Sequence, residues 1–128
     1  MNWQQYFENA KGTGFLATAN RKGEVNIAVY SRPNVMKDGA LAFGMTDRLT
    51  HANLSENPKA VYAFAEPGYR GVRIYLEKVR EDTGGPVLEH IRDRADDIVG
   101  PGTGKDVKFL VYFRVQDYLA LVGDSKPE

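Results

Sequence analysis

The chain has 128 residues, which is enough to bury the core of one domain, and we expect a single domain over residues 1–128. It carries 17 basic and 17 acidic residues, so its charge does not predict binding to nucleic acid or to an anionic membrane. It has no cysteine, which excludes a disulfide framework, a thiolate metal site and a thiol nucleophile.

The first elements in the chain are a short helix and three strands joined by tight turns. Apolar residues at helical spacing, followed by Gly12, predict a helix over residues 2–11. Its aromatic residues Trp3, Tyr6 and Phe7 are expected either to cap a barrel or to join a dimer core. Turns at 20–23 and 37–39 are typical of hairpins. The strands predicted in this half are Phe15–Ala19, Val25–Ser31 and Ala40–Met45.

The second half of the chain adds a short helix, three more strands and a longer helix. The longer helix starts at Pro86 and has an apolar stripe that ends at Ile98. The strands predicted here are Ala60–Ala65, Val72–Arg80 and Val107–Val115. Six antiparallel strands with few helices favour a barrel, because closing a sheet removes its exposed edges. No apolar run approaches ~18 residues and no leader pattern precedes the first helix, so we expect a cytoplasmic protein without a membrane segment.

The segment from Phe43 to Leu54 carries the clearest functional signal. An apolar strand gives way to Thr46 and Asp47, which are good N-cap residues, and then to a short helix with Leu49, Ala52 and the pair Asn53-Leu54 on its inner side. Arg48 and Thr50 then fall in the first turn of a helix, where free amides and the helix dipole favour an anion. The segment predicts a phosphate site. The alternative is that Asp47 is only a cap and that Arg48 and Thr50 are solvated.

Other polar residues give weaker signals. His51 is interpreted as a surface histidine of the short helix, although it follows Thr50 and is within reach of a phosphate or a dimer partner. Glu89 and His90 lie on the polar side of the longer helix and predict a solvated face, not a metal site. The loop 100–105 lacks the spacing of a nucleotide-binding phosphate loop. No residue is assigned a catalytic role.

Five segments, taken together and in order, resemble the pyridoxamine 5′-phosphate oxidase-related family of FMN-binding split barrels, in its short single-domain form. They span about the first two-thirds of the chain. The segments are Gly14–Thr18, Gly23–Ser31, Met45–Leu54, Asn57–Ala60 and Gly68–Arg73. The resemblance implies a mainly β fold, a six-stranded antiparallel split barrel with short flanking helices, which forms a homodimer.

The resemblance also implies one FMN in each of two clefts between the subunits. The flavin phosphate would lie on the strand-to-helix turn, and the strand 26–31 would run beside the isoalloxazine ring. Arg32 or Arg73 would place a cation near the flavin N1 and C2 oxygen, unless Arg73 simply points outward from its strand. The residues expected to bind the cofactor are Asn26, Ala28, Val29, Tyr30, Ser31, Met45, Thr46, Arg48, Leu49, Thr50 and Arg73.

The tail Val122–Glu128 departs from the family, because it lacks the Arg- and Trp-containing segment that helps true oxidases bind the pyridoxal substrate. The resemblance therefore supports FMN binding better than vitamin B6 oxidation. Three classes of function remain open. The first is a flavin oxidoreductase served by a nicotinamide nucleotide or a small redox carrier, and the second is an FMN-binding electron carrier or flavin store. The third is a split barrel that binds haem, a deazaflavin or a protein partner.

Overall fold

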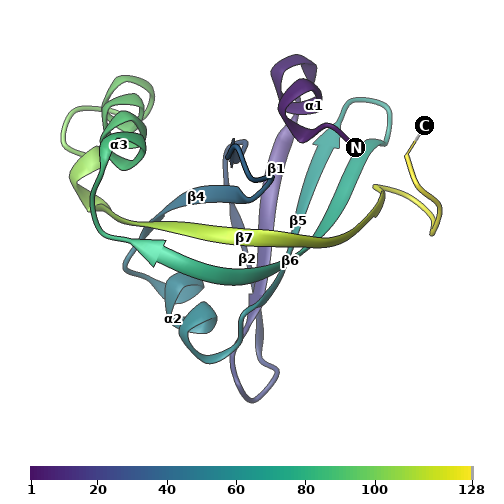
Figure 1. Ribbon diagram of the computed structural model, residues 1–128, viewed down its shortest axis with the longest axis horizontal. Coiled ribbons are helices and arrows are strands. Elements are labelled where there is room, and N and C mark those ends of the chain that lie inside the picture. The colour runs from purple at the N-terminus through teal and green to yellow at the C-terminus, as the bar shows by residue number, and fades with distance from the viewer. Residues whose placement is uncertain (128) are drawn as a thin grey trace.

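The computed structural model describes residues 1–127 and is mainly β, with three helices around one curled sheet (Figure 1). The helices are α1 (Trp3–Asn9), α2 (Leu49–Glu56) and α3 (Pro86–Ile98), with a short 3₁₀ turn at Gly104–Asp106. The strands are β1 (Thr13–Ala19), β2 (Val25–Val29), β3 (Asn34–Val35), β4 (Leu41–Thr46), β5 (Lys59–Glu66), β6 (Arg70–Asp82) and β7 (Val107–Ala120).

The strands form one antiparallel sheet in the order β2-β1-β5-β6-β7-β4-β3. The long strands β6 and β7 cross the molecule, with α3 near one end and the C-terminal segment near the other (Figure 1). Register shifts interrupt the β6–β7 pairing at Tyr75/Leu76 and at Lys78/Arg80. Such irregularities bend a sheet and increase its twist. The sheet therefore curls, and β2 and β3 are its two edge strands, each paired on one side only.

The predicted fold class is confirmed, and the differences lie in the lengths and number of strands. The sheet has seven strands over residues 1–127 instead of six, because β3 pairs with the start of β4. A strand of two residues after Pro33 is too short to show an alternating pattern. β2 ends at Val29, two residues before the predicted end. β7 continues to Ala120 because its second half pairs with β6 as far as Val72.

The main core lies inside the curl of the sheet and is rich in aromatic side chains. Its largest fully buried residues include Tyr62, Phe64 and Phe113. Helix α1 covers one opening, and its Trp3 and Phe7 are buried in the same cluster. The Phe7 ring lies 5.6 Å from the Phe64 ring, edge to face. Of the two expectations for the aromatic residues of α1, the structure supports a cap on the barrel.

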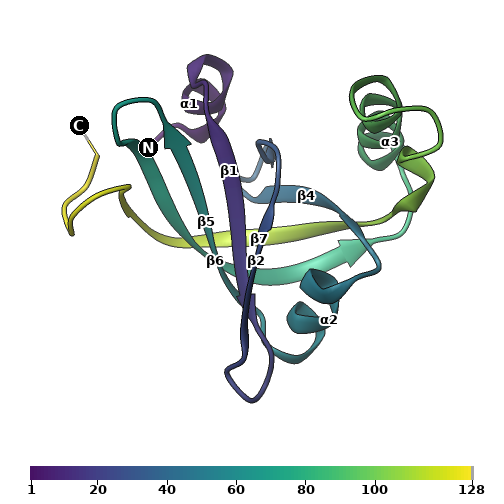
Figure 2. The same ribbon diagram turned by 180° about the vertical axis from the view of Figure 1, so that it is seen from behind.

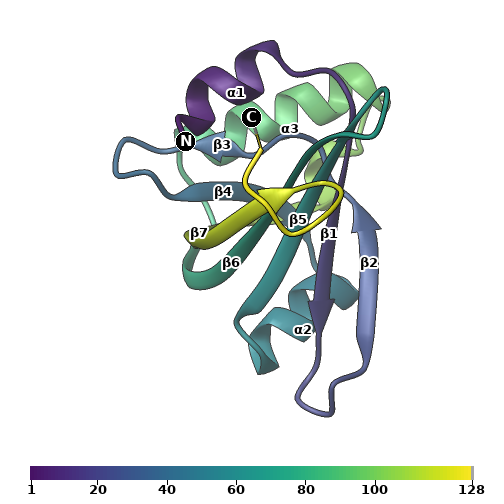
Figure 3. The same ribbon diagram turned by 90° about the vertical axis from the view of Figure 1, so that its right-hand side faces the viewer.

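Helix α3 packs on the outer face of the sheet through a second, smaller core. Leu88 is fully buried there with Ala42, Leu110 and Tyr112. The apolar stripe predicted for this helix continues past the buried contact, yet Ile98 stays 74 % exposed. Figure 3 shows α1 and α3 at the upper end of the molecule and α2 at the lower end. The exposed end of the stripe is therefore available for another contact.

Gly14 is required by a close approach between the core and Tyr30, the residue that follows β2. The Tyr62 hydroxyl donates to the Tyr30 carbonyl (3.1 Å), and a Cβ at position 14 would overlap both groups. We expect Gly14→Ala to lower the free energy of unfolding by about 1–3 kcal/mol, as overpacking does. Urea unfolding measures this change. Gly84→Ala is the control, since its Cβ would meet open space, and an equal loss there would contradict the explanation.

Candidate functional site

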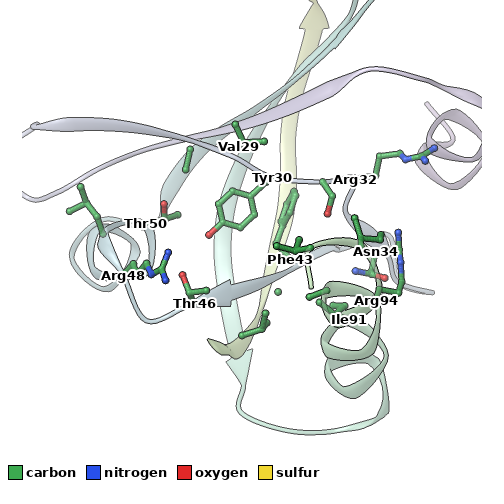
Figure 4. A pocket seen from close by; sticks show the side chains of 18 of the residues that line it. Val29, Tyr30, Arg32, Asn34, Phe43, Thr46, Arg48, Thr50, Ile91 and Arg94 are labelled. Carbon is green, nitrogen blue, oxygen red and sulfur yellow. The ribbon is translucent and has the colours of Figure 1, made fainter. Parts of the chain in front are cut away.

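A pocket of about 610 Å³ lies between the end of β2, the start of α2 and one face of α3, with β4 as its floor (Figure 4). The turn between β4 and α2 closes one end of the pocket. Phe43 and Gly44 form part of its floor. Nine of the eleven residues expected to bind a cofactor line it: Asn26, Ala28, Val29, Tyr30, Ser31, Thr46, Arg48, Leu49 and Thr50.

The turn before α2 differs from its predicted capping. Arg48 occupies the N-cap position, and no side chain caps the helix, so the prediction that Thr46 or Asp47 is the cap was wrong. Thr46 is the last residue of β4, and its strand conformation holds it back from the helix end. In contrast, α1 is capped by Asn2, whose side chain accepts from the Gln5 amide (3.0 Å). The amides of the first turn of α2 therefore lack both a side-chain acceptor and an intrahelical partner.

The inner face of α2 also differs from the prediction. Asn53 and Leu54 are buried as expected. Leu49 is 57 % exposed and Ala52 is exposed, so their placement on the inner side was wrong, and Thr50 is buried instead. The Asn53 side chain donates to the Thr18 hydroxyl (3.1 Å), which satisfies a polar pair inside the barrel wall. Because this pair sets the rotation of the helix, Thr50 is buried beside the pocket and Leu49 is exposed at the pocket's rim.

Tyr30 stands in the middle of the pocket, with its hydroxyl directed toward the end that holds Arg48 (Figure 4). Its ring packs edge to face on Phe43, with centroids 5.9 Å apart. Burial raises the pKa of the Tyr30 phenol, and the Thr50 hydroxyl offsets part of that rise. The phenol therefore stays protonated at neutral pH and can donate a hydrogen bond inside the pocket.

Arg32 and Arg73, the two arginines considered as cations beside the flavin ring, donate to backbone carbonyls and do not point into the pocket. The Arg73 guanidinium donates to the carbonyls of Ala120 (2.9 Å) and Gly123, outside the pocket. Arg32 lines the pocket, but its guanidinium turns away and donates to two carbonyls at the end of α1, Phe7 (2.7 Å) and Ala10 (3.0 Å). Met45, the other expected cofactor residue outside the lining, is 1 % exposed within the main core.

His51 is half-buried, so its interpretation as a surface histidine was wrong. Its side chain is 12 % exposed, and its ring stacks on Phe109 with centroids 3.8 Å apart and an interplanar angle of 2°. Its Nε2 lies 3.0 Å from Glu81 Oε1, and the Lys78 ammonium donates to the same oxygen (2.6 Å). This network fastens the first turn of α2 to β6 and β7.

The Glu81 carboxylate makes the network sensitive to acid. Burial alone would raise the pKa of Glu81, but hydrogen bonds from Lys78 and His51 outweigh it and hold that pKa below its ordinary value of 4.5. A carboxyl with a lowered folded-state pKa stabilises the fold above its ordinary pKa, and this contribution is lost as the pH falls through the folded value.

We therefore expect the free energy of unfolding to fall less steeply below pH 4.5 in Glu81→Gln than in the parent chain. The difference should be about 0.2–1 kcal/mol, because the pair is partly solvated. Urea unfolding from about pH 6 to about pH 3 measures it. If the free energy of unfolding falls with pH in parallel for the two proteins, Glu81 does not contribute to the loss of stability in acid.

The pocket also contains residues that the sequence did not assign to a site. Helix α3 lines one wall with Ile91, Ala95, Ile98 and Val99, and Arg94 lies on the same wall. The apolar stripe was visible in the sequence as helical spacing. The sequence did not show that the second half of this stripe faces the pocket, because that direction depends on how β7 pairs with β4.

Within residues 1–127 the structure has neither a membrane-spanning helix nor a cluster of metal ligands. No helix in residues 1–127 is long and apolar enough to cross a membrane. Nowhere in the same range do three or more acidic or histidine side chains gather closely enough to hold a metal ion.

The curled antiparallel sheet with two free ends is that of a split barrel, and solved structures share it. An FMN-binding protein from Syntrophomonas wolfei subsp. wolfei is 25 % identical, with a TM-score of 0.74 over 93 % of this chain and 83 % of its own. An F420 reductase is 17 % identical, with a TM-score of 0.68 over 93 % and 97 %. A candidate pyridoxamine 5′-phosphate oxidase from Listeria innocua is 13 % identical, with a TM-score of 0.66 over 92 % and 94 %.

No protein-family profile and no curated protein sequence matches the chain. Its similarity is carried by structure, and the chain has the split-barrel fold of the pyridoxamine 5′-phosphate oxidase-like proteins. The resemblance drawn from the five sequence segments is thus confirmed at the level of the fold.

Proposed function

We propose that this protein binds FMN in the pocket, with the phosphate on the first turn of α2. The observation that carries the proposal is the uncapped N-terminus of α2, which opens into the pocket beside Arg48 and Thr50. Free amides, a hydroxyl and a guanidinium are the donor set that a phosphate prefers. The guanidinium of Arg48 makes no ion pair with residues 1–127, so it is available to a ligand.

The remainder of the pocket fits a flavin ring. Its floor is apolar, and so is the α3 wall apart from Arg94, as a planar tricycle requires. The wall made by residues 28–31 belongs to an end of the sheet, since β2 pairs only with β1. An end strand keeps unpaired N–H and C=O groups, and these suit the polar edge of the ring. The Tyr30 hydroxyl adds a further donor between the ring and the turn.

Bound FMN would supply the transfer of electrons or hydride. The chain would hold the phosphate through Arg48, Thr50 and the amides of α2, and would exclude water from the ring with Phe43 and the α3 wall. We propose an oxidoreductase that takes electrons from a nicotinamide nucleotide or a small carrier. The sequence lacks a Gly-x-Gly-x-x-Gly fingerprint, so a nicotinamide would enter the flavin cleft only transiently.

A homodimer is part of this proposal. Strand β2, labelled in Figure 2, is an edge strand of the sheet. Its outer face exposes Val25 (83 %), Ile27 (65 %) and Val29 (70 %). Leu49 is also exposed, next to the phosphate turn. Contiguous apolar side chains on an end strand favour a protein interface. A second copy placed there would cover the mouth of the pocket beside Val29.

Titration of the ligand-free protein with FMN tests the proposal. We expect FMN fluorescence to be quenched and its visible absorption band to sharpen on binding. Haem and F420 serve as competitors, because haem and a deazaflavin are the alternative ligands left open by the sequence and one structural neighbour is an F420 reductase. Tighter binding of either would overturn the choice of FMN. Bleaching of bound FMN by NADH or NADPH would then separate an oxidoreductase from a carrier or store.

A further inference from the structure

A second pocket lies beside α1 and shares almost no residues with the flavin pocket. Its volume is about 840 Å³, and its walls are α1, the hairpin that joins β5 to β6, and the segment that follows β7. Figure 1 shows the hairpin and the C-terminal segment at the side of the molecule opposite α3. We infer that this pocket binds a free α-amino acid with an apolar or aromatic side chain, whose carboxylate contacts Arg70 and whose ammonium contacts Glu66.

The C-terminal wall of this pocket is held in place by hydrogen bonds to β6. The Leu121 amide donates to the Gly71 carbonyl (3.0 Å). The Arg73 guanidinium donates to the carbonyls of Ala120 (2.9 Å) and Gly123. The segment that follows β7 is therefore fixed beside the hairpin, and the pocket between them is part of the fold.

Glu66 and Arg70 lie directly opposite each other across the hairpin, yet they do not form an ion pair. Glu66 is the last residue of β5, Arg70 is the first residue of β6, and the two are partners in the strand register. The Glu66 carboxylate accepts from the Tyr6 hydroxyl (2.7 Å) through Oε2. The Arg70 guanidinium makes no hydrogen bond or ion pair with any of residues 1–127. A guanidinium and the second oxygen of a carboxylate are therefore available to a ligand that carries both charges.

Tyr6 fixes the carboxylate at the pocket wall. Burial raises the pKa of the Tyr6 phenol and its hydrogen bond to Glu66 raises it further, so the phenol remains a donor at neutral pH. Directly opposite residues of antiparallel strands have Cα atoms about 4.5–5.5 Å apart. Charges so close together match the ammonium and carboxylate of a single α-amino acid, whereas the two ends of a peptide lie farther apart.

Tyr69 indicates that the ligand also has an apolar part. It lies at the tip of the hairpin with a φ of 62°, in the left-handed region that a bulky side chain rarely adopts. Its ring is 86 % exposed, so packing in the core does not explain this conformation, and strain of this kind is common at ligand sites. Val122, on the C-terminal wall, is exposed and lines the same pocket. These two side chains provide an apolar contact for the side chain of the ligand.

Calorimetric titration with phenylalanine and two blocked forms tests the inference. Phenylalaninamide keeps the ammonium without the carboxylate, and N-acetylphenylalanine keeps the carboxylate without the ammonium. We expect phenylalanine to bind more tightly than either. Arg70→Gln should weaken phenylalanine roughly tenfold, as the loss of a charge-assisted hydrogen bond does, and leave phenylalaninamide unchanged. Glu66→Gln should weaken phenylalanine to a similar degree and leave N-acetylphenylalanine unchanged.

Two further variants separate this site from general effects of charge and stability. Arg21→Gln removes the same charge from an exposed hairpin outside the pocket and should leave phenylalanine binding unchanged. Tyr69→Gly should weaken phenylalanine without lowering the urea midpoint of unfolding, because glycine adopts a positive φ without strain.

Three results would overturn the inference. They are the absence of phenylalanine binding, a blocked form that binds as tightly as phenylalanine, and equal losses for Arg70→Gln and Arg21→Gln. The affinity for FMN should be the same in all of these variants, because none of the changed residues lines the flavin pocket. The inference therefore stands or fails separately from the proposed flavin site.

Discussion

Arg48→Ala is expected to lower the affinity for FMN by roughly one to two powers of ten. The change removes charge-assisted hydrogen bonds to the phosphate, each worth about 1.5–3 kcal/mol. Arg48 is exposed at the N-cap of α2, so its loss should not disturb the core. Fluorescence quenching of FMN by the parent and variant proteins gives the two dissociation constants.

Riboflavin, which has no phosphate, is the control ligand for this variant. It should bind both proteins equally, because the lost interaction was never available to it. Thr50→Val keeps the shape of the side chain without the hydroxyl and should cost less than Arg48→Ala, about 0.5–1.5 kcal/mol. A loss of riboflavin affinity equal to the loss for FMN would mean that Arg48 acts through the fold and that the phosphate lies elsewhere.

Ile27→Glu is expected to weaken the proposed dimer by roughly a hundredfold or more. The side chain stands in the middle of the apolar row on the outer face of β2, and a carboxylate there would be buried without a partner. Light scattering should then report a species near the chain mass of 14.3 kDa where the parent gives twice that mass. FMN affinity should fall in parallel, since the second copy would cover the pocket mouth.

Val79→Glu is the matched control for the dimer. Val79 is 43 % exposed on β6, so the same charge is added to the sheet away from β2. It should leave the mass unchanged. A parent protein that is monomeric with FMN bound, or an Ile27→Glu protein that stays dimeric, would rule out β2 as the interface.

The parts of the fold that were predictable from sequence are those with local causes. The turns at Gly23 and Gly39 need positive φ angles, 82° and 90°, and glycine marks such positions directly. The alternation in Val72–Arg80 likewise placed β6 within two residues of its observed ends. Pairing between strands far apart in the sequence was harder to predict. β7 runs five residues past the predicted end at Val115 only because β6 lies beside it, and no local pattern marks that pairing.

The turn between β4 and α2 shows the same division between local and distant causes. The change from strand to helix was predictable from the sequence, and the structure brings Thr46, Arg48 and Thr50 into one pocket as expected. The rotation of α2 was not predictable from the sequence, because it follows from the hydrogen bond between Asn53 and Thr18 on β1. His51 was misread for a similar reason. Its partners Glu81 and Phe109 lie 30 and more residues away in the sequence.

If the protein binds FMN as proposed, the missing cap of α2 would link its lifetime to the supply of FMN. A helix without a capping side chain is less stable by about 0.5–2 kcal/mol, and an anion seated on its first turn would provide the acceptor that Asn2 provides for α1. A ligand that binds only the folded chain also raises its stability by mass action. When flavin is scarce, the ligand-free chains would unfold and be degraded first, and the amount of protein in the cell would follow the amount of FMN.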